Sequence, residues 1–138
     1  MKPPKLRTQL PVVFDSEAVS RSVRGDAYLR TRLRIARDVG LPVVISAATL
    51  VEVSYPKIDR AALSWVRSYL DIVPVSEFIA DEASQLLAHA GLHGHKHAID
   101  AMVSATALAL GSRPIIFTSD PKDIALLTDG RASVFPLR

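Results

Sequence analysis

The sequence contains no cysteine, which excludes disulfide bonds and zinc sites built on thiolates. It also has no apolar run that approaches the roughly 18–20 residues of a membrane span, so we expect no membrane partner. The N-terminal stretch MKPPKLRTQLPVVFD is basic and lacks the apolar segment and cleavage site of a signal peptide. These absences fit a cytoplasmic protein, although exported proteins can lack cysteine too.

The composition that remains is typical of one compact domain. The chain has 138 residues, of which 49% are hydrophobic, and its mean hydropathy is +0.21, which argues against disorder. We expect a basic tail at residues 1–10 and a single domain at residues 11–138. The net charge of +3 and the isoelectric point of about 9.5 fit either ordinary solubility or a polyanionic partner.

Short apolar runs alternate with helical patterns along the chain. The runs predict strands at residues 11–14, 41–46, 71–75, 113–119 and 132–137. Helices are predicted at residues 17–24, 27–39, 47–54, 59–70, 77–90, 98–110 and 120–127, with a loop, GLHGH, at 91–95. This alternation predicts a three-layer α/β/α fold with a central, mostly parallel sheet of four to five strands.

Several carboxylates fall where ligands of parallel sheets bind. Asp15 directly follows the first predicted strand, and Asp120 follows the fourth after Thr118 and Ser119. The carboxyl ends of parallel strands meet at one edge, so both acids are expected there. Asp123 lies one helical turn after Asp120 and shares its helix face.

Two further acids interrupt apolar segments. Glu52 lies within AATLVEVS and Asp100 within HAIDAMVSATAL, where an unpaired carboxylate is costly to bury. Acids that converge repel one another unless cations compensate, and Lys122 is the basic residue within these segments. A divalent metal is the other solution, and oxygen ligands suit Mg²⁺ or Mn²⁺ rather than zinc.

The segments FDSEAV, ATLVEVS, HAIDAMVSATAL and FTSDPKDIALL, in this order, resemble the acidic motifs of PIN-domain nucleases, and of the VapC-type ribonuclease toxins in particular. The resemblance spans most of the chain and implies a PIN-like fold. It implies that the catalytic and metal-binding acids are Asp15, Glu52, Asp100 and Asp120, with Asp123 as a further metal ligand. Either Asp120 or Asp123 is the closer ligand. By the same resemblance, Ser16 and Thr118 orient a metal water or contact the substrate phosphate.

The function implied by the resemblance is hydrolysis of RNA phosphodiester bonds by an Mg²⁺- or Mn²⁺-dependent endoribonuclease, the toxin of a toxin–antitoxin pair. The implied partners are the RNA substrate, a small cognate antitoxin and a second copy of the chain in a homodimer. The alternative is a catalytically inactive PIN-like module that binds RNA or protein. The four histidines of HAGLHGHKHAID, just before Asp100, are more than the family pattern requires.

Each singled-out residue also has a simpler interpretation. Asp15 and Asp120 can be helix N-caps, Asp123 a first-turn acid, Glu52 a surface residue, and Asp100 a partner of His97. His89 and His93 have the spacing of helical zinc ligands, whereas His95 and His97 suit a solvated loop or a site near phosphate. A basic run in the first two helices is either a phosphate-binding surface or an exposed face, and comprises Arg21, Arg24, Arg30, Arg32, Arg34 and Arg37. A phosphoryl-accepting receiver-like domain is disfavoured because no D-x-D motif is present.

Overall fold

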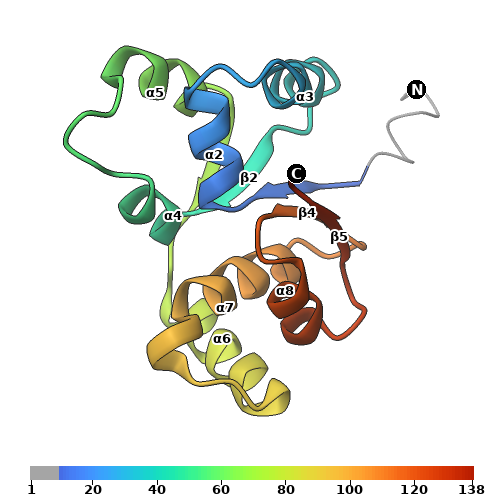
Figure 1. Cartoon of the computed structure of the whole chain (residues 1–138). Coiled ribbons are helices and arrows are strands. Elements are labelled where there is room, and N and C mark those ends of the chain that lie inside the picture. Colours follow the sequence, from blue (N-terminus) through green and yellow to red (C-terminus); the bar gives the residue numbers. More distant parts are fainter. Residues whose placement is uncertain (1–9) are drawn as a thin grey trace, which may run out of the picture.

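The computed structural model describes residues 10–138, so the expected basic tail lies almost wholly outside the described residues. Strands and helices alternate throughout this part of the chain (Figure 1). The strands are β1 (Val12–Phe14), β2 (Val43–Ser46), β3 (Leu70–Val73), β4 (Ile115–Thr118) and β5 (Ser133–Pro136). The helices are α2 (Ser16–Val23), α3 (Ala27–Asp38), α4 (Ala47–Glu52), α5 (Arg60–Arg67), α6 (Glu77–Ala90), α7 (Gly94–Ala109) and α8 (Pro121–Thr128).

The five strands form one sheet in the order β3-β2-β1-β4-β5, and every neighbouring pair is parallel. The chain adds β2 and β3 on one side of β1 and then returns to place β4 and β5 on the other. The strand order therefore reverses between β1 and β4. Beyond the carboxyl ends of these two strands lies the crevice in which open α/β sheets bind their ligands.

Helices cover both faces of the sheet. Helices α2, α3, α4 and α5 lie on one face, and α6, α7 and α8 lie on the other (Figure 1). Strand β1 shows why both faces are apolar: Val12 and Phe14 pack into the first layer of helices, whereas Val13 packs into the second. The predicted three-layer α/β/α fold with a mostly parallel sheet is confirmed, and the sheet is parallel throughout.

The core on the α2–α5 face is centred on aromatic residues of the middle strands. Phe14 and Phe117 are 0% and 1% exposed, and their ring centroids lie 5.2 Å apart. Burial of each such side chain contributes roughly 1.5–3 kcal/mol. This packing fixes β1 beside β4, and so fixes the residues that follow both strands.

Three predicted boundaries were wrong. The predicted helix 59–70 ends at Arg67, because residues 70–73 pair with β2 as strand β3. That strand ends before Pro74, which has no N–H for the sheet. The predicted loop 91–95 is shorter, since α7 begins at Gly94: the N–H groups of Lys96 and His97 donate to the carbonyl of His93 and close a first turn.

Within residues 10–138, no helix combines the length and the apolar character needed to cross a bilayer.

Candidate active site

Asp15 joins the end of β1 to the end of β4. Its backbone N–H donates to the carbonyl of Phe117. One carboxylate oxygen, Oδ1, accepts from the N–H of Ala18 at 2.9 Å, so Asp15 caps helix α2 as its position suggested. The other oxygen, Oδ2, accepts from the N–H of Ser119 at 2.8 Å. The side chain is 5% exposed, and these bonds hold it at the crevice between the two strands.

Burial and hydrogen bonding have opposite effects on the pKa of Asp15, and the net effect is an increase. Burial raises the pKa of the carboxyl above its ordinary value. Hydrogen bonds lower this pKa, and they come from the N–H groups of Ala18 and Ser119 and from the hydroxyl of Thr118. The negative charge of Asp120 raises it further. Asp15 is thus both a helix cap and a member of an acidic group.

Thr118 connects two acids of the site. Its side chain is 0% exposed, and its Oγ1 accepts from the N–H of Asp120 at 2.9 Å while the hydroxyl hydrogen-bonds Asp15. These contacts support a role in orienting Asp15 and the start of α8. Its predicted contact with a metal water or a substrate phosphate stays a prediction. Ser16 is half-buried in the first turn of α2, and its predicted role stays a prediction.

Helix α8 presents two acids in one turn. Asp120 occupies the N-cap position, but its side chain makes no capping hydrogen bond, so the simple cap interpretation does not account for it. Its carboxylate is exposed. Asp123 lies in the first turn, as expected for an acid near a helix N-terminus, and its side chain is 33% exposed.

Asp100, on α7, is where the acids converge. Its carboxyl pKa is raised to about 7, first by burial and then by the negative charges of Asp120, Asp123, Glu52 and Asp15. These four acids come from the end of β1, from α4 and from α8. Glu52 is exposed at the last residue of α4, yet it is near enough to affect Asp100. The charges of the other four predicted acids therefore reach Asp100, whereas within residues 10–138 the ligand atoms of Asp15, Glu52 and Asp120 belong to no group of three within 4.8 Å.

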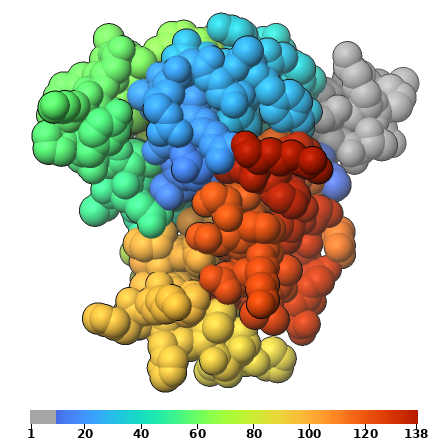
Figure 2. Space-filling view, in the orientation of Figure 1, coloured from blue at the N-terminus to red at the C-terminus, as the bar shows by residue number. Residues whose placement is uncertain are grey.

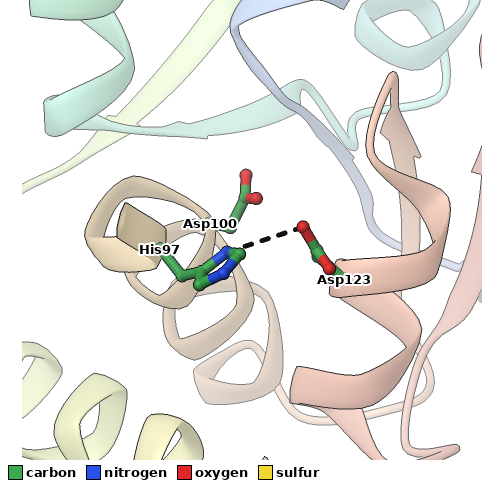
Figure 3. Close-up of side chains that lie close together, drawn as sticks. All are labelled: His97, Asp100 and Asp123. Carbon is green, nitrogen blue, oxygen red and sulfur yellow. Dashed lines mark ion pairs between the residues drawn. The ribbon is translucent and has the colours of Figure 1, made fainter. Parts of the chain in front are cut away.

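His97 was missed as a member of this group. It was assigned to a loop or to a substrate-facing position, but it is half-buried within α7, at a kink where φ is −116° and ψ is 17°. Its Nδ1 lies 3.5 Å from Oδ2 of Asp123, so this contact joins α7 to α8 (Figure 3). The expected partner had been Asp100. The spacing of His97 and Asp100, three residues apart on one helix, was the signal available in the sequence.

Three of these side chains form a tighter group. One ligand atom each from His97, Asp100 and Asp123 lies within 4.8 Å of the other two. No other set of three or more potential metal ligands lies this close together within residues 10–138. Neither His89 nor His93 belongs to the group. In the space-filling view, the segments that carry the acids meet near the middle of one face (Figure 2).

The arginine run of the first two helices is used largely within the fold. The guanidinium groups of Arg30 and Arg34 lie over the ring of Trp65, at 4.9 and 5.2 Å from its centroid. That of Arg37 lies over Tyr69 at 3.7 Å. Arg24 pairs with Glu17 at 2.9 Å. These contacts favour the interpretation of a structural helix face, with aromatic partners that the sequence had not indicated.

Similar folds occur in several solved structures. VapBC2 from Rickettsia felis, bound to a DNA fragment from its promoter, matches at 15% identity over 94% of this chain and 100% of that chain, with a TM-score of 0.71. A toxin–antitoxin complex from Klebsiella pneumoniae matches at 23% identity over 83% and 90%, with a TM-score of 0.60. FitAcB from Neisseria gonorrhoeae matches at 17% identity over 90% and 96%, with a TM-score of 0.61. No curated protein matches significantly.

These likenesses, all below 25% identity, establish the fold. The sequence itself goes further, because the family model described as PIN domain matches residues 12–126, from the first strand to the last helix. That match covers most of the chain and includes all five acids of the candidate site, and the protein therefore belongs to the PIN-domain family.

Proposed function

We propose that the protein is a divalent-metal-dependent endoribonuclease that hydrolyses RNA phosphodiester bonds. The observation that carries this proposal is the convergence of Asp15, Glu52, Asp120 and Asp123 on Asp100, whose pKa is raised to about 7. Crowded carboxylates are costly in a fold unless a cation offsets their charge, and catalytic sites are a common reason for such crowding. Membership of the PIN-domain family supports the nuclease class.

The donor set fits a divalent ion. The acids offer oxygen atoms, which suit Mg²⁺ or Mn²⁺, and they lie beyond the carboxyl ends of β1 and β4. In this proposal Asp15, Glu52, Asp100 and Asp120 hold the ion, with Asp123 as a further ligand. When bound, the ion supplies an activated water and neutralises charge on the phosphate.

The chain's own residues set up this chemistry. The N–H groups of Ala18 and Ser119 fix both oxygens of Asp15, so this carboxylate keeps one orientation. Thr118 holds the start of α8 through the N–H of Asp120, which leaves the Asp120 carboxylate at the crevice. In the metal-free protein the pKa of Asp100 is raised to about 7, so this carboxyl is only partly protonated at neutral pH, and binding of a cation would release the remaining proton.

We further propose that the nuclease is the toxin of a toxin–antitoxin pair, acting in the cytoplasm. The support is structural: a similar fold occurs in a toxin–antitoxin complex from Klebsiella pneumoniae, and another occurs in VapBC2 of Rickettsia felis. A small antitoxin, an RNA substrate and a second copy of the chain are the partners that follow from this proposal. A catalytically inactive PIN-like binding module is the second candidate, and the exposure of Glu52 is the observation that favours it.

Cleavage of a 5′-labelled RNA by the purified chain tests the proposal. We expect cleavage with Mg²⁺ or Mn²⁺, none with EDTA, and products that carry 5′-phosphate and 3′-hydroxyl ends. Asp100→Asn is expected to lower the rate by roughly 100-fold or more, since it removes a charge that the reaction requires. Asp81→Asn, an exposed acid on α6, is the matched control and is expected to cleave normally.

The inactive-module alternative predicts a different result. RNA or protein binding would then persist, while cleavage would be absent or equal in wild type and Asp100→Asn. Metal-dependent cleavage that Asp100→Asn retains in full would contradict the assignment of this site.

A further inference from the structure

We propose that His97 is a nitrogen ligand of the metal site, and that with Asp100 and Asp123 it forms a mixed nitrogen–oxygen subsite that prefers Mn²⁺ to Mg²⁺. The PIN-domain resemblance implied a site of carboxylates alone. This inference therefore rests on the proposed function for its context, and it adds a ligand and a metal preference that the acids do not supply.

The geometry of the three side chains carries the inference. Nδ1 of His97 faces Oδ2 of Asp123 at 3.5 Å, and one ligand atom of each of the three residues lies within 4.8 Å of the others (Figure 3). Nitrogen and oxygen ligands bind such ions at about 2.1 Å, so two ligands on opposite sides of one ion lie about 4.2 Å apart. The three ligand atoms are therefore spaced about as closely as ligands of a single ion.

His97 differs from its neighbours in the histidine-rich segment. His93 and His95 are exposed, whereas the side chain of His97 is only 13% exposed. The backbone at His97 is non-helical, and its ring lies across from Asp123 of α8 (Figure 3). Restricted side chains lose less entropy on binding a ligand, which favours His97 as a ligand over the others.

The chemistry of imidazole determines the metal preference. Imidazole nitrogen suits transition metals, whereas Mg²⁺ binds carboxylates, carbonyls and water. Among the divalent transition metals, Mn²⁺ binds a given set of nitrogen and oxygen ligands most weakly. Its binding at this site is therefore expected to be reversible. In this proposal Asp123 binds the ion together with His97. This gives a role to Asp123, the second of the two acids, Asp120 and Asp123, that follow β4.

Pulsed electron paramagnetic resonance of bound Mn²⁺ tests the inference directly. We expect the wild-type chain with substoichiometric Mn²⁺ to show modulation from a coordinated nitrogen-14. His97→Asn, whose amide oxygen can replace Nδ1, is expected to bind Mn²⁺ without this modulation. In calorimetric titrations it is expected to lose about tenfold or more in Mn²⁺ affinity, since loss of even an outer-shell partner costs roughly 10–100-fold. Its Mg²⁺ affinity is expected to change by less than about twofold.

His95→Asn is the matched control, because it makes the same change at an exposed histidine two residues away. It is expected to keep both the nitrogen signal and the affinity. Bound Mn²⁺ without nitrogen modulation in the wild type would overturn the inference and leave an ordinary His97–Asp123 ion pair. Equal modulation in His97→Asn would overturn it as well.

The same samples separate this inference from the proposed function. Metal-dependent RNA cleavage with no nitrogen signal contradicts the His97 ligand and supports the nuclease. A nitrogen signal that is lost in His97→Asn, in a chain that cleaves no RNA with either metal, supports the His97 ligand and contradicts the nuclease.

Discussion

At the scale of single residues, the acids of the site differ in how much they serve the fold. Asp15 accepts hydrogen bonds from Ala18 and Ser119 through two different oxygens. An Asn at this position has one acceptor oxygen, so its NH₂ group would face one of these N–H groups. We therefore expect Asp15→Asn to perturb folding in addition to the proposed metal site. Asp100 has no comparable backbone bond among the described residues, which makes Asp100→Asn the cleaner test.

The titration of Asp100 predicts an unusual pH dependence of stability. In the metal-free folded protein the carboxyl has a pKa of about 7, against 3.8 for the ordinary value, which applies to the unfolded chain. Between these values the folded state binds the extra proton. The free energy of unfolding therefore contains a contribution that is complete below about pH 4 and is lost as the pH rises toward 7.

Asp100→Asn removes that contribution. We expect urea unfolding in EDTA to show a flatter dependence on pH between 4 and 8 in the variant. Above pH 7 the variant is expected to be more stable than wild type by about 1–2 kcal/mol, a value reduced for the partial exposure of the group. Parallel pH profiles for the two proteins would show that Asp100 titrates normally.

At the scale of helices and strands, Arg30 links three helices. Its guanidinium donates from Nε to the carbonyl of Ser22 at 2.7 Å and from Nη2 to the carbonyl of Val23 at 3.1 Å, which supplies donors to two carbonyls at the C-terminal end of α2. The same group lies over Trp65 of α5, 4.9 Å from the ring centroid. Asp15 caps the other end of α2, so Arg30 helps to hold the helix that starts at the candidate site.

Because Arg30 links three helices, truncation of its side chain is expected to destabilise the fold. We expect Arg30→Ala to lower the free energy of unfolding by about 1–3 kcal/mol, because two carbonyls lose a charged donor. Arg30→Lys is expected to recover less than half, since an ammonium cannot reproduce the planar fork. Arg34 also lies over Trp65, and Arg34→Ala removes only this stacking contact. It is expected to lower the free energy of unfolding by less than about 1 kcal/mol. Urea unfolding measures all three, and equal losses for Arg30→Ala and Arg34→Ala would contradict the linking role.

At the scale of the whole molecule, the site joins segments that are far apart in the sequence. The acids come from the end of β1, from α4, from α7 and from α8. They lie where the α2–α5 layer meets the α6–α8 layer (Figures 1 and 2). A cation bound there would contact elements from both layers. We therefore expect metal binding to raise the stability of the entire domain.

We expect saturating Mn²⁺ to raise the melting temperature of the wild type, with about 2.7 kcal/mol of added stability when the free ion is 100-fold above its Kd. Asp100→Asn is expected to gain less, and Asp81→Asn, an exposed acid on α6, is expected to gain as much as the wild type. Scanning calorimetry with EDTA as the reference measures the shift. Equal shifts in all three proteins would mean that the ion binds elsewhere.

The sequence by itself determined the fold class and the positions of the acids along it. Apolar β-branched runs form buried strands, and polar residues at their ends are local features, so Asp15 and Asp120 could be assigned to one edge of the sheet. The tertiary structure alone decided the strand order, the pairing of His97 with Asp123, and the placement of Thr118 between Asp15 and Asp120. The physical reason is that these contacts depend on how α7 and α8 pack against the sheet and each other, and this packing brings together residues that local patterns cannot relate.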